Sequence, residues 1–413
     1  MEYSGPDKAG LPETLRSRRA HIRSPLVQIA LANVGYAQAT YLSLLIILPA
    51  RAASIGGHTH KTVLLALVAA AGAIIALPTG IVAGLVSDRL LDSHGSRRSV
   101  LAIGAVTCAA LLAVLPFTRS AASLLIAWCG VQIGLNVVYT IITTSLLDWF
   151  ATDHRGRASA YAGTGQVTGA LLASGLVFAV GGYPTTLGAV SGVIALAAAL
   201  PAMLGRHPAK APLSGELPPS TSPARGHYRD VRLAFAVRAV VTFANTLVFT
   251  FANYYVSDVL HLRDPQRFVG LAAGEMSVLV LAGALCSGWA SDRSGRRRWY
   301  VVGAVLFMCA GEVLLATWQS VPGVLTACAF VGFGYGVYLS IDQALTADVL
   351  PDPRCFGRDV GIMNAAVSAP QVGAPALGTL LLSVSATYSV LFSVGALITL
   401  SGVAFVLPIR SVR

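Results

Sequence analysis

Polar and ionisable side chains recur at helical spacing inside otherwise apolar stretches of this 413-residue chain. Tyr335, Tyr338 and Asp342 are spaced i, i+3, i+7 and therefore share one face of a predicted helix. A carboxylate buried there either takes up a proton, because burial disfavours its charged form, or is neutralised in a fixed salt bridge, for instance with Arg238. This face could therefore bind a proton coupled to a substrate or simply hold two helices together.

Three other apolar stretches carry polar stripes of the same kind. Their members are Asn33, Tyr36 and Thr40; Gln132, Asn136, Tyr139 and Thr143; and Asn245, Phe249 and Asn253. Aromatic and amide side chains suit a neutral polar or glycosidic ligand better than a strongly ionic one. The alternative use of such residues is hydrogen bonding between helices.

Two further carboxylates, Glu275 and Glu312, lie in apolar stretches and are also candidates for proton coupling. Both fall toward the outer ends of their predicted helices, where a side chain can reach water. All eight histidines fall in predicted loops or tails, so a histidine relay inside the helices is not expected. HExxH, GxSxG and phosphate-loop motifs are absent from the sequence, and we expect neither an enzyme nor a bound cofactor or metal.

The composition explains why these polar residues stand out. Only 11% of the residues are charged, 55% are hydrophobic and the mean hydropathy is +0.70, whereas soluble proteins carry roughly 25% charged residues. This excludes a cytosolic enzyme, a disordered protein and a secreted domain. Twelve runs are long enough to cross a bilayer: 26–50, 63–86, 99–117, 122–147, 157–180, 184–204, 233–258, 268–290, 299–317, 322–347, 358–383 and 387–407.

The basic residues predict the topology of these twelve spans. With the N-terminus inside, 24 of the 29 lysines and arginines fall on the inner side and five on the outer side. This is the positive-inside pattern, and it explains the net charge of +11 without a nucleic-acid partner. We expect a multi-pass protein of the cell membrane with both termini in the cytoplasm.

A polar segment rich in proline and serine divides the spans into six and six. The predicted organisation is a cytoplasmic tail over 1–25, a six-helix bundle over 26–204, a cytoplasmic linker over 205–232, a second bundle over 233–407 and a cytoplasmic tail over 408–413.

The two halves share a motif at equivalent positions. A Gly-x3-Asp-Arg core occurs at Gly84 to Arg89 and again at Gly288 to Arg293, each followed by a glycine and a pair of arginines. Asp148 and Asp348 end the fourth span of each half. Two similar halves of six helices are typical of secondary transporters.

The pattern resembles the loop 2–3 signature of the major facilitator superfamily, although the first copy has extra residues, 91–94, before its glycine. The stretch 335–351, together with 357–364, resembles the branch that contains sucrose/proton and glycoside–cation symporters. The resemblance implies an all-α membrane protein whose twelve helices form two pseudo-symmetric six-helix bundles.

The resemblance also implies roles for the residues. Spans 1, 4, 7 and 10 line the central cavity in facilitators, which would place the four polar stripes around a substrate. The aspartate at position 88 would contact the start of span 11 when the inner side closes, with a helix N-terminus as its electrostatic partner. The implied cytoplasmic gate comprises Gly84, Asp88, Arg89, Arg97, Arg98, Asp148, Gly288, Asp292, Arg293, Arg296, Arg297, Asp348 and Arg358. The alternative is that these arginines only fix the topology.

The leading hypothesis is a monomeric secondary active transporter that works by alternating access. Its partners would be protons, a sugar-like or neutral polar solute, and the lipid bilayer. Proton-driven efflux of a drug or secondary metabolite is the alternative, although span 5 lacks the Gly-Pro pair that is usual in drug/proton antiporters of the superfamily. A non-transporting sensor is a third possibility.

Overall fold

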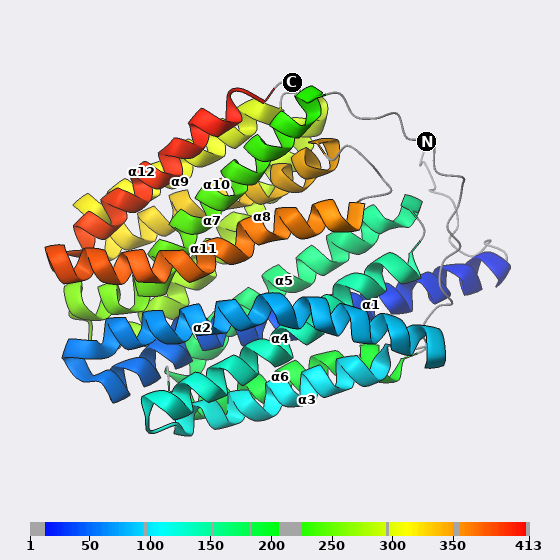
Figure 1. Ribbon diagram of the computed structural model, residues 1–413, viewed down its shortest axis with the longest axis horizontal. Coiled ribbons are helices and arrows are strands. Elements are labelled where there is room, and N and C mark those ends of the chain that lie inside the picture. Colours follow the sequence, from blue (N-terminus) through cyan, green and yellow to red (C-terminus); the bar gives the residue numbers. More distant parts are fainter. Residues whose placement is uncertain are drawn as a thin grey trace, which may run out of the picture.

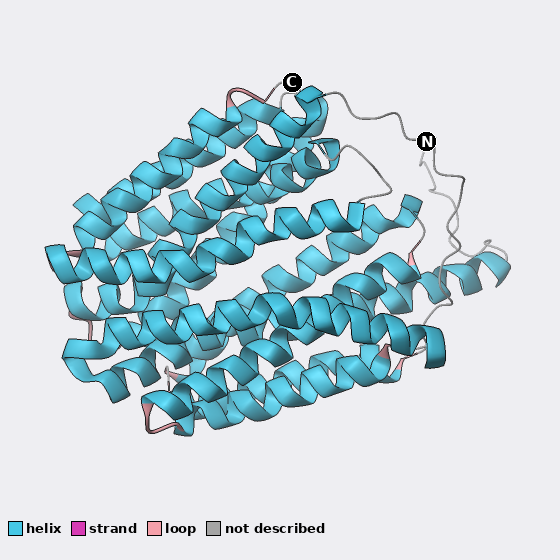
Figure 2. Ribbon diagram, viewed as in Figure 1, coloured by secondary structure: helices cyan, strands magenta, loops and turns pink. Residues whose placement is uncertain are grey.

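The structure is a computed structural model that describes residues 13–94, 97–150, 152–181, 183–205, 225–294, 297–349 and 356–409. Over these ranges the chain is helical, with short connecting loops (Figure 2). The helices are α1 (Glu13–Leu42), α2 (Leu48–His94), α3 (Arg98–Val114), α4 (Ala121–Trp149), α5 (Thr152–Val180), α6 (Pro184–Leu204), α7 (Arg225–Val259), α8 (Pro265–Ser294), α9 (Arg297–Thr317), α10 (Val321–Val349), α11 (Phe356–Ser385) and α12 (Tyr388–Val406). A π-helical turn, η1 (Ser43–Ile47), follows α1, and a 3-10 turn, η2 (Leu115–Phe117), follows α3.

Twelve helices in the described part of the chain are long and apolar enough to cross a membrane, which confirms the predicted number of spans. The first span runs from Pro25 to Gly57 and the second from Thr59 to Leu90, so α2 contains the end of one and the whole of the next. Gly57 makes this bend possible, because its φ of 60° lies in the left-handed region that favours glycine.

Two helices begin earlier than the predicted spans. α1 starts at Glu13, inside the expected N-terminal tail, and α7 starts at Arg225, inside the expected linker. Their first turns are rich in arginine, which is a good helix former. Hydropathy marks the part of a helix that lipid surrounds and not the point where the helix begins.

The helices form two bundles, α1–α6 and α7–α12, with matching internal packing (Figure 1). In the first bundle α1 packs on α5 and α6, and α3 packs on α4 and α6; in the second, α7 packs on α11 and α12, and α9 packs on α10 and α12. The α2–α4 contact corresponds to α8–α10 in the same way. Between the bundles, α2 packs on α11 and α5 packs on α8, which relates the halves by an approximate two-fold axis.

Among the described residues, the apolar clusters join the two bundles at one end of the molecule. We call the end where α1 begins and α12 ends the terminal end, and the opposite end the distal end (Figure 1). One large cluster joins both bundles at the distal end and includes Ile46, Leu65, Phe251 and Val269. At the terminal end the bundles have separate clusters, one around Leu101 and Ile141 and the other around Val305 and Ile341. α2 and α11 correspondingly diverge toward the terminal end (Figure 1).

Helices α8 and α10 approach each other closely at two glycines. A Cβ atom built at Gly336 would overlap the carbonyl oxygen of Val280, and one at Gly283 would overlap that of Phe333. Small residues allow this approach between membrane helices. The glycine-rich run 332–336 therefore serves helix packing.

We expect Gly336→Ala to lower the stability of the protein by about 1–3 kcal/mol, because a backbone carbonyl must move to admit the methyl group. Thermal unfolding in detergent measures the loss. Gly163→Ala is the matched control, since no atom lies within 4 Å of a Cβ built there. An equal melting temperature for the two variants would contradict the packing role of Gly336.

Candidate functional site

A buried ion pair joins α7 to α10 in the second bundle. Arg238 Nε donates to Asp342 Oδ2 at 2.9 Å, and Arg238 Nη2 binds the same oxygen. The hydroxyl of Tyr338 donates to Asp342 Oδ1 at 2.9 Å. The Arg238 and Asp342 side chains are only 13% and 8% exposed. Both carboxylate oxygens are therefore occupied by donors, and the pair carries no net charge.

Tyrosines from the first bundle face this ion pair. Tyr36 of α1 and Tyr139 of α4 stack with their ring centroids 4.9 Å apart. Tyr139 is 40% exposed and interacts electrostatically with Arg238, across the boundary between the bundles. Tyr41 of α1 lies near Tyr335 of α10, again across the boundary between the bundles. Polar groups from α1, α4, α7 and α10 thus meet between the two halves, and we call this group the central site.

The central site holds only part of the predicted stripes. Tyr36, Tyr139, Tyr335, Tyr338 and Asp342 take part in it, and Asn245 is buried beside Tyr335.

Other members of the stripes serve helix packing. Asn33 lies against α5, where its Oδ1 accepts a hydrogen bond from Gln166 at 3.1 Å. Gln132 packs close to Gly72 of α2, and its carbonyl oxygen accepts a hydrogen bond from Asn136 at 2.8 Å. A polar stripe in the sequence identifies one face of a helix, but it does not show which neighbouring helix or cavity that face contacts.

A second group of polar residues closes the distal end between the bundles. Lys61 Nζ lies 2.6 Å from Asp258 Oδ1 and 2.7 Å from Oδ2, and it sits 4.8 Å from the centre of the Tyr254 ring. The Tyr254 hydroxyl donates to the carbonyl oxygens of Pro49 and Lys61, and the Tyr388 hydroxyl donates to Asp258. We call Lys61, Tyr254, Asp258 and Tyr388 the distal lock.

The π-helical turn η1 contributes to this closure. A π turn interrupts the regular hydrogen-bond ladder and is frequent at functional sites. Asn253 Nδ2, from α7, donates to the carbonyl oxygen of Leu45 within this turn at 3.1 Å. The predicted pocket residue Asn253, which is 5% exposed, is therefore part of the contact between the bundles at the distal end.

We expect Asn253→Leu to weaken distal closure by about 1–2 kcal/mol, because the Leu45 carbonyl then loses a buried donor. Spin labels at Ser54 and Ser383, which are exposed on opposite bundles, report the change as a larger share of long distances in a cysteine-depleted background. Thr250→Val is the control, since the Thr250 hydroxyl bonds only within its own helix, to Thr246 at 2.7 Å. Unchanged distances in Asn253→Leu would contradict the role of η1.

The predicted gate residues of the first half form a cluster within the first bundle. Arg97 lies 2.6 Å from Asp88 and 2.9 Å from Asp148, and it also binds the hydroxyl of Ser87. The Asp88 side chain is 61% exposed. The neighbouring Arg98 binds the carbonyl oxygen of Gly205 at the end of α6.

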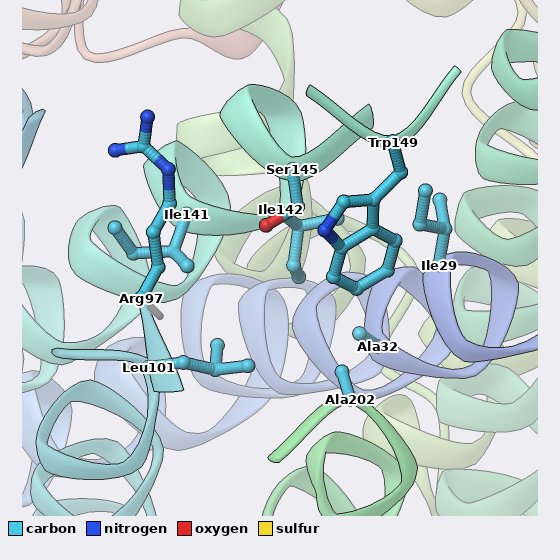
Figure 3. A pocket seen from close by; sticks show the side chains of 9 residues that line it. All are labelled: Ile29, Ala32, Arg97, Leu101, Ile141, Ile142, Ser145, Trp149 and Ala202. Carbon is cyan, nitrogen blue, oxygen red and sulfur yellow. The ribbon is translucent and has the colours of Figure 1, made fainter. Parts of the chain in front are cut away.

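A small cavity lies beside this cluster, with Arg97 on one side of it and the Trp149 ring on the other (Figure 3). Its lining is almost entirely apolar, from Ile29, Leu101 and Ile141 among others. The cavity is enclosed by helices of the first bundle alone, so it belongs to the packing of that bundle.

The remaining gate predictions can be placed only in part. Arg89 lies near the terminal end of α2, which continues to His94, and Arg293 and Arg297 lie at the corresponding ends of α8 and α9. A Cβ atom at Gly84 would lie 3.9 Å from Thr140, an ordinary contact, so this glycine is not needed for close packing. Arg296, the surroundings of Gly288 and the side chains of Asp292, Asp348 and Arg358 lie outside the described residues. The predicted contact between Asp88 and span 11 therefore stays a prediction.

The two other predicted carboxylates lie away from the central site. Glu312, on α9, is 1% exposed and makes no hydrogen bond with a described residue. Glu275, on α8, is partly exposed and borders Cys328 of α10.

Sequence reasoning overlooked Lys61, Asp258, Tyr254 and Tyr388, which lie at span ends where a charge is unremarkable. The sequence feature that could have pointed to them is the opposite charge of Lys61 and Asp258. These residues lie at two span ends that the pseudo-symmetric fold brings together. It becomes visible only when the packing of α2 and α7 is known.

Comparisons with known proteins identify the family of this fold. The family model described as Major Facilitator Superfamily matches residues 29–276 and 234–413. Multidrug resistance protein 3 of Bacillus subtilis is 30% identical over 137 residues, which are 33% of this chain and 26% of that protein. Polyol transporter 5 of Arabidopsis thaliana is 28% identical over 139 residues, 32% of this chain and 24% of that protein.

Multidrug resistance protein Stp of Mycobacterium tuberculosis is 30% identical over 106 residues, 26% of this chain and 19% of that protein. The chain thus spans about a quarter or less of the length of these curated relatives. Among solved structures, a bacterial homologue of the human lysosomal transporter Spinster, in an inward-facing and unoccupied conformation, superposes with a TM-score of 0.65 at 14% identity. The match covers 94% of this chain and 95% of that one.

Proposed function

Because this chain belongs to the major facilitator superfamily, we propose that it is a secondary active transporter that moves a small organic solute by alternating access. One observation carries the proposal: in the part of the chain that the structure describes, two related bundles share an apolar core at the distal end, have separate cores at the terminal end, and hold a polar site between them. A site between two halves that part at one end can be reached from that end alone. Rocking of the halves would transfer access to the other end.

The distribution of basic residues supports a cytoplasmic terminal end. The twelve apolar helices and the family make the chain an integral multi-pass membrane protein. Arg97, Arg98, Arg293 and Arg297 all lie at helix ends on the terminal side, and positive charge marks the cytoplasmic side of a membrane protein. The structure then represents the inward-facing state, with the distal lock closing the outer side of the cell membrane.

The chemistry of the central site supports a neutral polar solute. The ion pair between Arg238 and Asp342 has no net charge, so a strongly ionic ligand would have no counter-charge there. The exposed ring of Tyr139 offers a flat face to a sugar or polyol ring or chain, and Asn245 offers amide groups. The polyol transporter among the relatives and the resemblance to sugar symporters support the same class. Proton-coupled symport is our leading proposal.

Efflux of a drug or secondary metabolite is a second candidate, favoured by a specific observation. Two of the three relatives are named multidrug resistance proteins. The tyrosines of the central site would also stack on an aromatic drug.

Transport by the purified protein in liposomes separates the two candidates. With an acidic exterior, we expect accumulation of a labelled polyol or disaccharide that is abolished by a protonophore. Accumulation of a lipophilic drug in the opposite direction, with none of the polyols or sugars moved, would favour efflux. Movement of no solute against its gradient, in either direction, would contradict secondary active transport.

A further inference from the structure

Glu312 is a buried carboxylate that takes part in none of the ion pairs found among the described residues. It is 1% exposed, and neither of its oxygens forms a hydrogen bond with a residue that the structure describes. The ion pairs found among the described residues involve other side chains. A charged carboxylate this deeply buried, with no cation among the described residues around it, is strongly destabilised, so the group carries a proton in this conformation.

The neighbours of Glu312 come from several helices and are neutral. A Cβ atom built at Gly395 of α12 would lie 3.9 Å from the Glu312 carboxyl carbon and 3.5 Å from Val248 of α7, which places the carboxyl group between α9, α12 and α7. Polar or titratable groups near it are Thr399 of α12 and Cys309 of α9 itself.

The described residues of α10 and α8 nearest to Glu312 bring no cation to it. From α10, Val331 packs against Gly311, next to Glu312 in the chain. Glu275, the carboxylate of α8, borders Cys328 of α10.

An aromatic cap separates Glu312 from the distal surface. The cap consists of Tyr255, Tyr388 and Phe392, with ring centroids 4.9 Å apart for Tyr255 and Phe392 and 5.6 Å apart for Tyr255 and Tyr388. The Tyr255 hydroxyl donates to the carbonyl oxygen of Leu315, one turn of α9 closer to the distal end than Glu312. Phe392 lies one turn of α12 distal to Gly395.

The cap is fastened to the distal lock. Tyr388, a member of both, donates its hydroxyl hydrogen to Asp258 Oδ2 at 2.9 Å, and the same carboxylate binds Lys61 of the other bundle. Separation of the bundles at the distal end removes Lys61 from Asp258. Asp258, which accepts the hydrogen bond from Tyr388, is then free to move, and the aromatic cap is no longer held in place.

We propose that Glu312 is the proton-binding site of the transporter and that it exchanges its proton with the distal compartment when the lock opens. With the cap loosened, water reaches the carboxyl group, and the proton passes between water and the carboxylate. Closure of the lock favours the neutral form, since the described residues around the group offer no cation and only the Thr399 hydroxyl as a polar neighbour from another helix. This inference rests on the proposed function, because proton binding that favours one state is how an ion gradient drives alternating access.

Asp342 is the less suitable proton carrier. Its two oxygens already accept hydrogen bonds from Arg238 and Tyr338, so a proton would have to displace a cation. At Glu312 a proton would displace no cation, because neither carboxylate oxygen is bound by one among the described residues.

Infrared spectroscopy of the purified, full-length protein in lipid tests the assignment without any solute. We expect the carbonyl band of a protonated carboxylic acid near neutral pH, lost in Glu312→Gln and retained in Glu275→Gln. Glutamine is neutral and close in shape to the protonated acid, so the fold should survive. A band that Glu312→Gln leaves unchanged would overturn the proposal. Because no transport is measured, this result is independent of whether the protein moves a solute.

The route to the distal side has its own test, with Glu312 intact. Tyr388→Phe keeps the ring but removes the hydroxyl that binds Asp258. We expect the carboxylic acid band to shift severalfold faster after transfer to deuterated water. Tyr183→Phe, at an exposed tyrosine between α5 and α6, is the control and should exchange at the wild-type rate. Equal exchange rates in the two variants would refute exchange through the cap.

Discussion

Arg238→Met is expected to produce the largest loss of stability and to abolish transport. The variant removes the cation from the buried Asp342 side chain, which is 8% exposed, and breaking a buried ion pair from one side costs about 3–5 kcal/mol. The side chain of methionine fills a similar volume, so the loss reports the charge and not a cavity. Thermal unfolding in detergent and uptake into liposomes measure the two effects.

The double variant Arg238→Met with Asp342→Asn separates charge from packing. Removing both charges leaves no uncompensated ion, and we expect most of the stability to return while transport stays impaired. A double variant as unstable as the single one would show that the ion pair is not the reason for the loss. Recovery of full transport would show that the central site does not need the pair.

Asp258→Lys is expected to have the largest effect on the conformational equilibrium. It places a second cation beside Lys61 and removes the acceptor of Tyr388. Like charges in contact and the lost hydrogen bond together disfavour distal closure by roughly 2 kcal/mol, which is about a 30-fold change in population. The value is moderate because the Asp258 side chain is 33% exposed and partly screened by water. Distances between spin labels at Ser54 and Ser383 measure the shift.

The charge-exchanged variant, with Lys61→Asp added to Asp258→Lys, is the control. It restores an attractive pair between the bundles but not the hydrogen bond to Tyr388, so we expect partial recovery of the short distance. A distance distribution that equals that of Asp258→Lys alone would argue against an electrostatic lock.

The sequence predicted the membrane-spanning architecture well because lipid imposes a strict rule on it. An apolar run of about 20 residues has few alternatives to a spanning helix. The internal repeat at Gly84 and Gly288 then indicated two related bundles. The positions where α1 and α7 begin were not predicted, because hydropathy identifies only the part of a helix that lipid surrounds and these first turns lie outside it.

The candidate site was predictable only as a set of helix faces. The stripe on α10 led to Asp342, and Arg238 was the partner considered for it; the structure brings these two together. Asn33 and Asn253 carry the same sequence signal as Tyr36 and Asn245, yet one bonds to α5 and the other to η1. The choice between a ligand-facing and a helix-facing role depends on the rotation of each helix, which the spacing of residues does not determine.

The distal lock could not be predicted from local pattern at all. Lys61 and Asp258 are 197 positions apart, and each lies at a span end where a charged residue is common. Only the packing of the two bundles makes them neighbours. Contacts that exist in one state of a transporter leave little trace in local sequence patterns.

Paired distance measurements at the two ends of the same molecule test alternating access most directly. One spin-label pair, at Ser54 and Ser383, reports the distal end; the other, at the exposed Leu85 of α2 and Leu285 of α8, reports the terminal end. The two-bundle mechanism predicts opposite changes: Asp258→Lys lengthens the distal distance and shortens the terminal one. Distances that lengthen together at both ends, or a terminal distance that does not respond, would contradict it.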